Sequence, residues 1–142
     1  MNWFRKAAEQ GEPAVQFNLG NCYVKGRGIS KDVVKALEWY RRAAEQQYAA
    51  AQFNLGSFLA RGDGVEKDMG EAIRWFREAA ENGLARAQTA LGGSYATGEG
   101  VAKDLIESAK WFRKAADQGD VGGQYLLGLA YVFGDGLPKD YQ

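Results

Sequence analysis

The sequence has 142 residues, of which 18 are basic, 18 are acidic and none is histidine, so its formal net charge is zero. Because both charges are mixed along the chain, no basic stripe is present to attract phosphates, and nucleic acid is not an expected partner. Charges also interrupt every apolar stretch before the roughly 20 residues that a membrane span needs. We therefore expect a soluble protein without membrane insertion.

A period of 36 residues runs through the whole chain without an insertion. It carries the pair Leu-Gly at 19–20, 55–56, 91–92 and 127–128, and the tryptophans at 3, 39, 75 and 111. Periods of 20 to 50 residues indicate stacked supersecondary units that bury their apolar faces against each other. We expect one continuous domain, 1–142, with a half repeat at 1–10, full repeats at 11–46, 47–82 and 83–118, and a half repeat at 119–142.

The first helix of each unit, which we name helix A, is expected over about 13–25 in the first full unit. An apolar stripe at i, i+4, i+7 and i+8 defines its core face, formed by Val15, Leu19, Cys22 and Tyr23. Gly26 is expected to end this helix in a left-handed conformation. Cys22 recurs as Phe58, Ser94 and Ala130, so we interpret it as a buried, inert thiol.

The second helix, helix B, is expected to begin after Asp32, whose carboxylate suits an N-cap. On its solvent face, Arg41 and Glu45 have the i, i+4 spacing of an ion pair, which recurs in the other units. Glycines at 11, 83 and 119 are expected to close helix B, and Gln47 at the equivalent position predicts a less regular helix end.

Gly20 and its copies fall inside helix A, where glycine costs roughly 0.8–1.0 kcal/mol relative to alanine. A recurring cost of this kind indicates a close helix crossing. We expect the small face of helix A to lie against alanines and an aromatic ring of helix B.

The unit resembles the Sel-one-like repeat, a relative of the tetratricopeptide repeat. The resemblance rests on AAEQG, an AQFNLG helix, a GxG loop, Lys-Asp and a KALEWY helix with a second alanine pair, and it covers the whole chain. It implies an all-α fold, in which antiparallel helix pairs stack into a right-handed superhelix with helix A on the concave face. It also implies a role as an adaptor that binds other proteins.

The residue types argue against catalysis. Because the sequence has no histidine, it lacks the commonest general base, and the serine and cysteine triads and most zinc sites are excluded. The GRGISKD and GDGVEKD loops follow helices and recur as connectors, so we interpret them as structural rather than as phosphate-binding loops. The acidic loop residues lack calcium-loop spacing. We expect no enzyme activity, no metal and no cofactor.

The face of helix A opposite the core stripe carries aromatic rings, amides and cations, which suit the side chains, backbone and carboxylates of a bound peptide. Asn18 and Asn54 recur at one position, which suggests a ladder along the groove. Alternatively, Phe17 and Phe53 pack against helix A of the next unit and the asparagines bond neighbouring backbone, and both interpretations can be partly true. The candidate protein-binding residues are Phe17, Asn18, Asn21, Lys25, Phe53, Asn54, Ser57, Arg61, Arg86 and Tyr125.

The chain begins inside a helix B and ends just after another would begin, so neither end has a polar capping unit. It lacks a secretory signal in its first ten residues, but a chain that begins in mid-repeat leaves its compartment open. Our first interpretation is a part of a longer array. Alternatively, the array is a structural spacer or self-associates head to tail through its ends.

Overall fold

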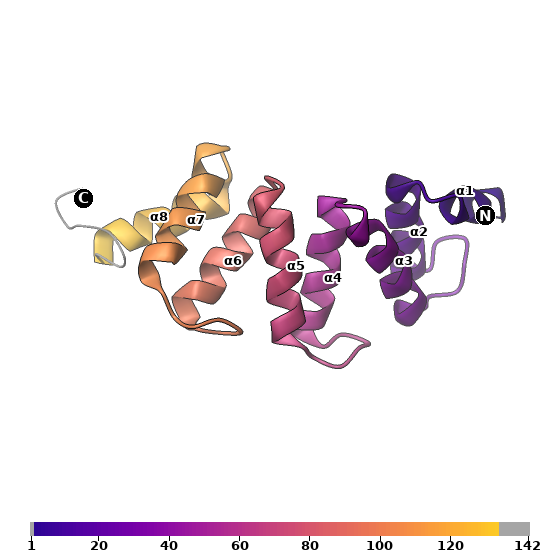
Figure 1. Cartoon of the computed structure of the whole chain (residues 1–142), viewed down its shortest axis with the longest axis horizontal. Coiled ribbons are helices and arrows are strands. Elements are labelled where there is room, and N and C mark those ends of the chain that lie inside the picture. Colours follow the sequence, from indigo (N-terminus) through magenta and orange to yellow (C-terminus); the bar gives the residue numbers. More distant parts are fainter. Residues whose placement is uncertain (1, 134–142) are drawn as a thin grey trace.

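The computed structural model describes residues 2–133, and these fold into helices without a strand. The helices follow one another along the long axis of the molecule (Figure 1). Their bounds are α1 Asn2–Glu9, α2 Pro13–Lys25, α3 Val33–Glu45, α4 Ala49–Arg61, α5 Met69–Glu81, α6 Ala85–Thr97, α7 Leu105–Asp117 and α8 Val121–Phe133.

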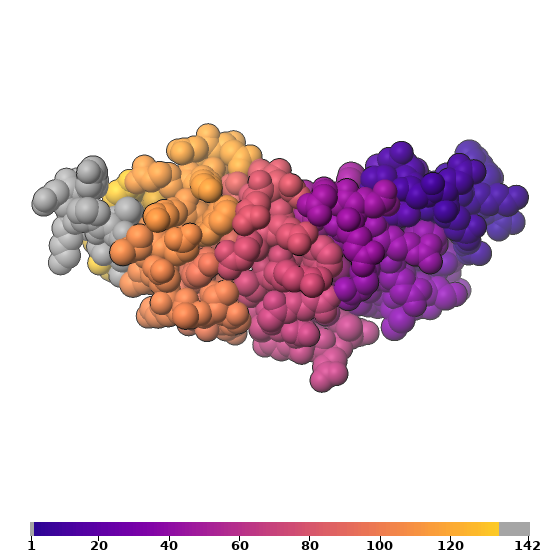
Figure 2. Space-filling model, viewed as in Figure 1, coloured from indigo at the N-terminus to yellow at the C-terminus, as the bar shows by residue number. Residues whose placement is uncertain are grey.

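The expected all-α solenoid is confirmed. Helices α2, α4, α6 and α8 are the A helices, and α1, α3, α5 and α7 are the B helices. Each helix packs mainly against its neighbours in the chain, which produces an elongated body (Figure 2). Alanine, leucine and aromatic side chains from α3 to α7 form one continuous core, and a smaller cluster joins α1, α2 and α3. The hydrophobic core therefore extends as a strip along the stack of helices and is not concentrated at one central point.

The helix boundaries follow the expected capping chemistry. The Asp32 carboxylate accepts a hydrogen bond from the backbone N–H of Lys35 at 3.1 Å, and Asp68 and Asp104 cap α5 and α7 in the same way. Gly26 has φ of +69° and ends α2, with Gly62 and Gly98 in the same left-handed conformation after α4 and α6. These caps confirm the sequence interpretation.

The A helices α2, α4 and α6 each cross the B helix that follows them at a glycine, as the sequence predicts. A Cβ added to Gly20 would lie 2.6 Å from the Tyr40 ring and 3.2 Å from the backbone oxygen of Ala36. Gly92 lies equally close to Phe112. The recurring glycine therefore allows two helix backbones to approach across an aromatic ring.

The expectation of a less regular helix end at Gln47 is wrong. Gln47 adopts φ of +67°, as the equivalent glycines do. The backbone N–H of Tyr48 donates to Ala43 at 3.2 Å, and that of Leu84 donates to Ala79 at 3.1 Å in the next unit. The bond that closes the turn after the helix is therefore the same at both ends. At Gln47 the left-handed conformation is imposed on a residue with a Cβ, which costs about 1–2 kcal/mol.

Two further expectations are corrected. Arg41 pairs with Glu71 of the next B helix, at 2.6 Å between Nη1 and Oε1, and not with Glu45. This pair joins two units instead of stabilising one helix. Cys22 is partly exposed rather than buried, because it lies at the edge of the core stripe, whose centre is taken by Leu19 and Tyr23.

Glutamines of the A helices bind each unit to its neighbours, a role that the sequence reasoning missed. Gln52 is fully buried, and its Nε2 donates to the backbone oxygen of Ala44, near the end of α3, at 3.0 Å. Its Oε1 accepts from Asn82, which follows α5, at 3.2 Å. Gln16 and Gln88 make equivalent bonds to the ends of the adjacent B helices. The signal was present, because glutamine recurs at positions 16, 52, 88 and 124.

Candidate peptide-binding groove

An open groove of about 340 Å³ lies between α2, α4 and the start of α6. Its walls come mainly from the A helices, which the 36-residue period places side by side. Eight of the ten residues expected on the helix A face line it: Phe17, Asn21, Lys25, Phe53, Asn54, Ser57, Arg61 and Arg86.

The centre of the groove is a tyrosine hydroxyl between two amides. The Tyr40 hydroxyl donates to Oδ1 of Asn21 at 2.5 Å. Burial raises the pKa of Tyr40 above its ordinary value, and a hydrogen bond from the Asn54 side chain opposes that shift. The three groups come from α3, α2 and α4. They hold the two amides in fixed positions, and each amide has further hydrogen-bonding capacity toward a ligand.

Cations surround this centre. The guanidinium carbon of Arg86 lies 5.0 Å from the centroid of the Phe53 ring, and that of Arg61 lies 5.3 Å from Phe58. Arg61 also donates to Asp63 at 2.8 Å. Lys25, at the end of α2, is exposed and also lines the groove. Stacking fixes the two guanidinium groups over aromatic faces, so the groove offers a positively charged rim to an acidic ligand.

The rings of the groove also pack against neighbouring helices. The Phe17 centroid lies 5.7 Å from that of Tyr40 and 5.3 Å from that of Tyr48. Phe53 lies 5.7 Å from Phe76. Both phenylalanines are nevertheless partly exposed. Packing and groove lining are therefore compatible at the same positions.

Asn18 and Tyr125 do not line this groove. Asn18 is exposed on α2, and the amide that faces Asn54 is Asn21, one helical turn later. The groove therefore does not contain the expected ladder of Asn18 and Asn54, because Asn18 lies outside it. Tyr125 lies on α8 and is 66% exposed. The sequence analysis did not single out Tyr40, which is buried in the core and also lines the groove.

A second, apolar pocket of about 270 Å³ lies between α6, α7 and α8. Seven of its nine lining residues are counterparts, two repeats later, of residues in the groove; among them, Gly93 replaces Asn21, Leu126 replaces Asn54, and Leu129 replaces Ser57. The same surface thus changes from polar and cationic near the N-terminus to apolar near the C-terminus.

Between positions 2 and 133 no cluster of three or more acidic, cysteine or histidine side chains has the arrangement of a metal site. Over the same range, no helix has both the length and the apolar character needed to cross a bilayer.

An all-α solenoid with a continuous helix A surface defines a class of repeat proteins built for contact with other macromolecules. The Sel1 repeat model matches residues 1–12, 13–48, 49–84, 85–120 and 121–142, and the chain belongs to this family. Sel1 repeat proteins are generally protein-interaction scaffolds.

Solved structures agree with this assignment. The chain is 44% identical to a protective antigen with an SLR fold, present in uropathogenic Escherichia coli strains, with a TM-score of 0.94 over 99% of this chain and 30% of that one. It is 43% identical to a Sel1 repeat protein from Oxalobacter formigenes, with a TM-score of 0.92 over 96% of this chain and 56% of that one. Cysteine rich protein B of Helicobacter pylori is 25% identical, with a TM-score of 0.70 over 89% and 90% of the two chains. The chain thus spans less than two thirds of the first two proteins. Among curated proteins, no match to the chain is found.

Proposed function

We propose that the chain is a non-catalytic interaction module that binds an extended segment of a partner protein along its helix A face. The observation that carries this proposal is the groove itself, where two amides, a tyrosine hydroxyl and three cations surround one open space. Amides can bind a peptide backbone, and cations can bind its carboxylates. A carboxylate-bearing segment is therefore the proposed ligand.

The apolar pocket between α6 and α8 extends this proposal. A ligand that uses both places has an acidic residue for the groove and, further along its chain, an apolar residue for the pocket.

The test is a peptide-library selection on the parent protein and on the double variant Asn21→Ala, Asn54→Ala. Asn18→Ala is the matched control, because Asn18 is an exposed asparagine on the same helix outside the groove. We expect one shared motif on the parent and on the control, and its loss from the double variant at equal helicity by circular dichroism. Equal enrichment on all three proteins would exclude the groove as the binding site.

A second candidate function is head-to-tail self-association, which the exposure of apolar side chains at both ends favours. Trp3 is 80% exposed, whereas Trp75 at the equivalent position is 3% exposed because neighbouring units cover it. At the opposite end, Phe133 is 66% exposed. Light scattering distinguishes the candidates: the mass rises with concentration and falls on Phe133→Glu if the ends associate, and it stays that of one chain otherwise.

A further inference from the structure

An arginine of each B helix has a partner position on the following A helix, 18 residues later. Nη2 of Arg77, in the second full unit, donates to the hydroxyl of Tyr95 in the third unit at 2.8 Å, and the guanidinium carbon lies 5.6 Å from the ring centroid. Arg113 and Tyr131 repeat the hydrogen bond and the 5.6 Å stacking distance. The repeat therefore places a tyrosine side chain on an A helix beside an arginine of the preceding B helix.

The second unit lacks this phenol. Leucine occupies position 59, where the other units have Tyr23, Tyr95 and Tyr131. Arg41, the counterpart of Arg77, turns to Glu71 of the next B helix. The Glu71 carboxylate also accepts from Nε1 of Trp75 at 3.2 Å. The arginine thus keeps its position in the repeat, but no ring of this chain lies beside it at residue 59.

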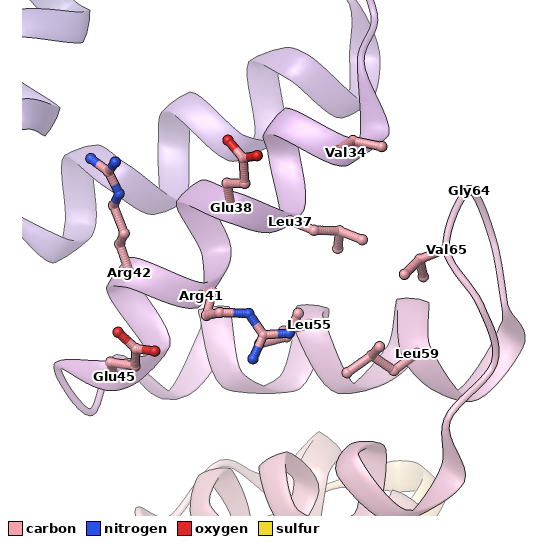
Figure 3. Close-up of a pocket in the computed structure, with 10 residues that line it drawn as sticks. All are labelled: Val34, Leu37, Glu38, Arg41, Arg42, Glu45, Leu55, Leu59, Gly64 and Val65. Atoms are coloured by element: carbon pink, nitrogen blue, oxygen red, sulfur yellow. The ribbon is translucent and has the colours of Figure 1, made fainter.

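A cavity of about 410 Å³ occurs at this place. Figure 3 shows the side chains of Leu37, Leu59 and Val65 around one space, with Arg41 along its side. Its lining residues Leu37, Leu55, Gly64 and Val65 correspond to Ile73, Leu91, Gly100 and Val101, which are the residues 36 positions later, just as Leu59 corresponds to Tyr95. The cavity therefore occupies the place in the second unit that corresponds to the tyrosine of the third.

The chemistry of the cavity defines its ligand. Six of its ten lining residues are uncharged, and the four charged ones balance, since two are arginines, Arg41 and Arg42, and two are glutamates, Glu38 and Glu45. Such a site does not select a strongly charged group. One Arg41 nitrogen is used by Glu71, and a guanidinium has five N–H donors, so others are available to a hydroxyl. An apolar wall with a planar cation beside it suits an aromatic ring that carries a hydroxyl.

We propose that this cavity binds the side chain of an exposed tyrosine on a partner protein, which completes the Arg–Tyr pair that the chain forms internally elsewhere. The site shares no lining residue with the helix A groove, so it is a second contact point and does not depend on the groove. Its volume lies within the range of ordinary ligand pockets, about 300–1,000 Å³.

The probe is N-acetyl-L-tyrosinamide, titrated into the 15N-labelled parent and followed by amide chemical shifts. We expect saturable shifts at Gly64 and Val65. N-acetyl-L-phenylalaninamide should bind several-fold more weakly because it lacks the hydroxyl. Equal affinity for the two probes would overturn the proposed recognition of the hydroxyl, and an absence of shifts around the cavity would overturn the site.

Two substitutions, each of which gives one unit the residue found at the same position of another, make the test specific. Leu59→Tyr supplies the missing ring, so it should raise the melting temperature and weaken probe binding at least tenfold. Tyr95→Leu should create a second cavity, with new shifts at Gly100 and Val101. The second variant keeps the test decisive if the first does not fold. Unchanged probe binding by a folded Leu59→Tyr variant, or no new site in Tyr95→Leu, would contradict the proposal.

Discussion

Gly56 of α4 lies against Phe76 of α5 so closely that a Cβ on Gly56 would be 2.9 Å from the ring atom Cε1. The same Cβ would lie 3.1 Å from the backbone oxygen of Ala72. Neither contact is possible for a larger residue unless the ring or the helix shifts. The glycine therefore sets the distance between the two helices of a repeat, and the burial of the ring offsets its low helix propensity.

Gly56→Ala should destabilise the protein by about 1–3 kcal/mol, as overpacking of a core typically does. The matched control is Gly93→Ala, also inside an A helix, where an added Cβ would meet no atom within 4 Å. It should stabilise the protein by up to about 1 kcal/mol through helix propensity. Urea unfolding of the two variants measures both values, and a loss of equal size in both would refute the crossing as the cause.

Gln52→Ala should cost about 1–3 kcal/mol, because it leaves the backbone oxygen of Ala44 without its side-chain donor in a buried place. Gln124 is the equivalent residue in α8 and is exposed, so Gln124→Ala should change the free energy of unfolding by less than about 0.5 kcal/mol. Chemical denaturation compares the pair. Equal losses would show that the bonds of Gln52 do not link the units.

Gln47→Gly should stabilise the protein by up to about 1 kcal/mol, since glycine adopts φ of +67° without a steric penalty. Gly83→Ala, at the equivalent position with φ of +92°, should have the opposite effect of about 1 kcal/mol. Thermal unfolding midpoints report both changes. A destabilised Gln47→Gly variant would mean that the bonds of the Gln47 side chain to Gln52 and Asn82 outweigh the strain.

The hydrogen bond from Arg41 lowers the pKa of Glu71 below its ordinary value of 4.5. Because the folded state favours the carboxylate, this contribution to stability is present above about pH 4.5 and is lost as the pH falls through the lower, folded pKa. The melting-temperature difference between the parent and Glu71→Gln should thus be largest near neutral pH and shrink in acid. Arg41→Gln should remove the same pH dependence. A difference independent of pH would contradict the assignment.

Lys25→Gln combined with Arg86→Gln should weaken binding of a selected acidic peptide about tenfold and reduce its dependence on salt, because both cations lie at the groove. Arg74→Gln is a suitable control, since Arg74 is exposed on α5, stacked 4.7 Å from the Trp75 ring, and does not line the groove. Isothermal titration at two salt concentrations provides the values. An unchanged affinity in the groove variant would exclude charge recognition there.

Much of the fold follows from local rules, and these were readable in the sequence. The caps at Asp32 and Gly26, the crossing glycines and the core stripe depend on residues within one unit. The predicted partner of Arg41 and the expected ladder of Asn18 and Asn54, which were wrong, concern contacts between units. The partner of Arg41 is 30 residues away, and Gln47 adopts the left-handed conformation of the equivalent glycines although it has a Cβ.

The sequence by itself therefore determined the repeat, its helices and the composition of the helix A face, because a strict period repeats one local solution. Only the tertiary structure decided which amides meet, so that Asn21 rather than Asn18 lies across from Asn54. It also showed that one leucine in place of tyrosine, at residue 59, coincides with a cavity. Both depend on how neighbouring units are placed against each other, and side chains far apart in the chain meet only after stacking.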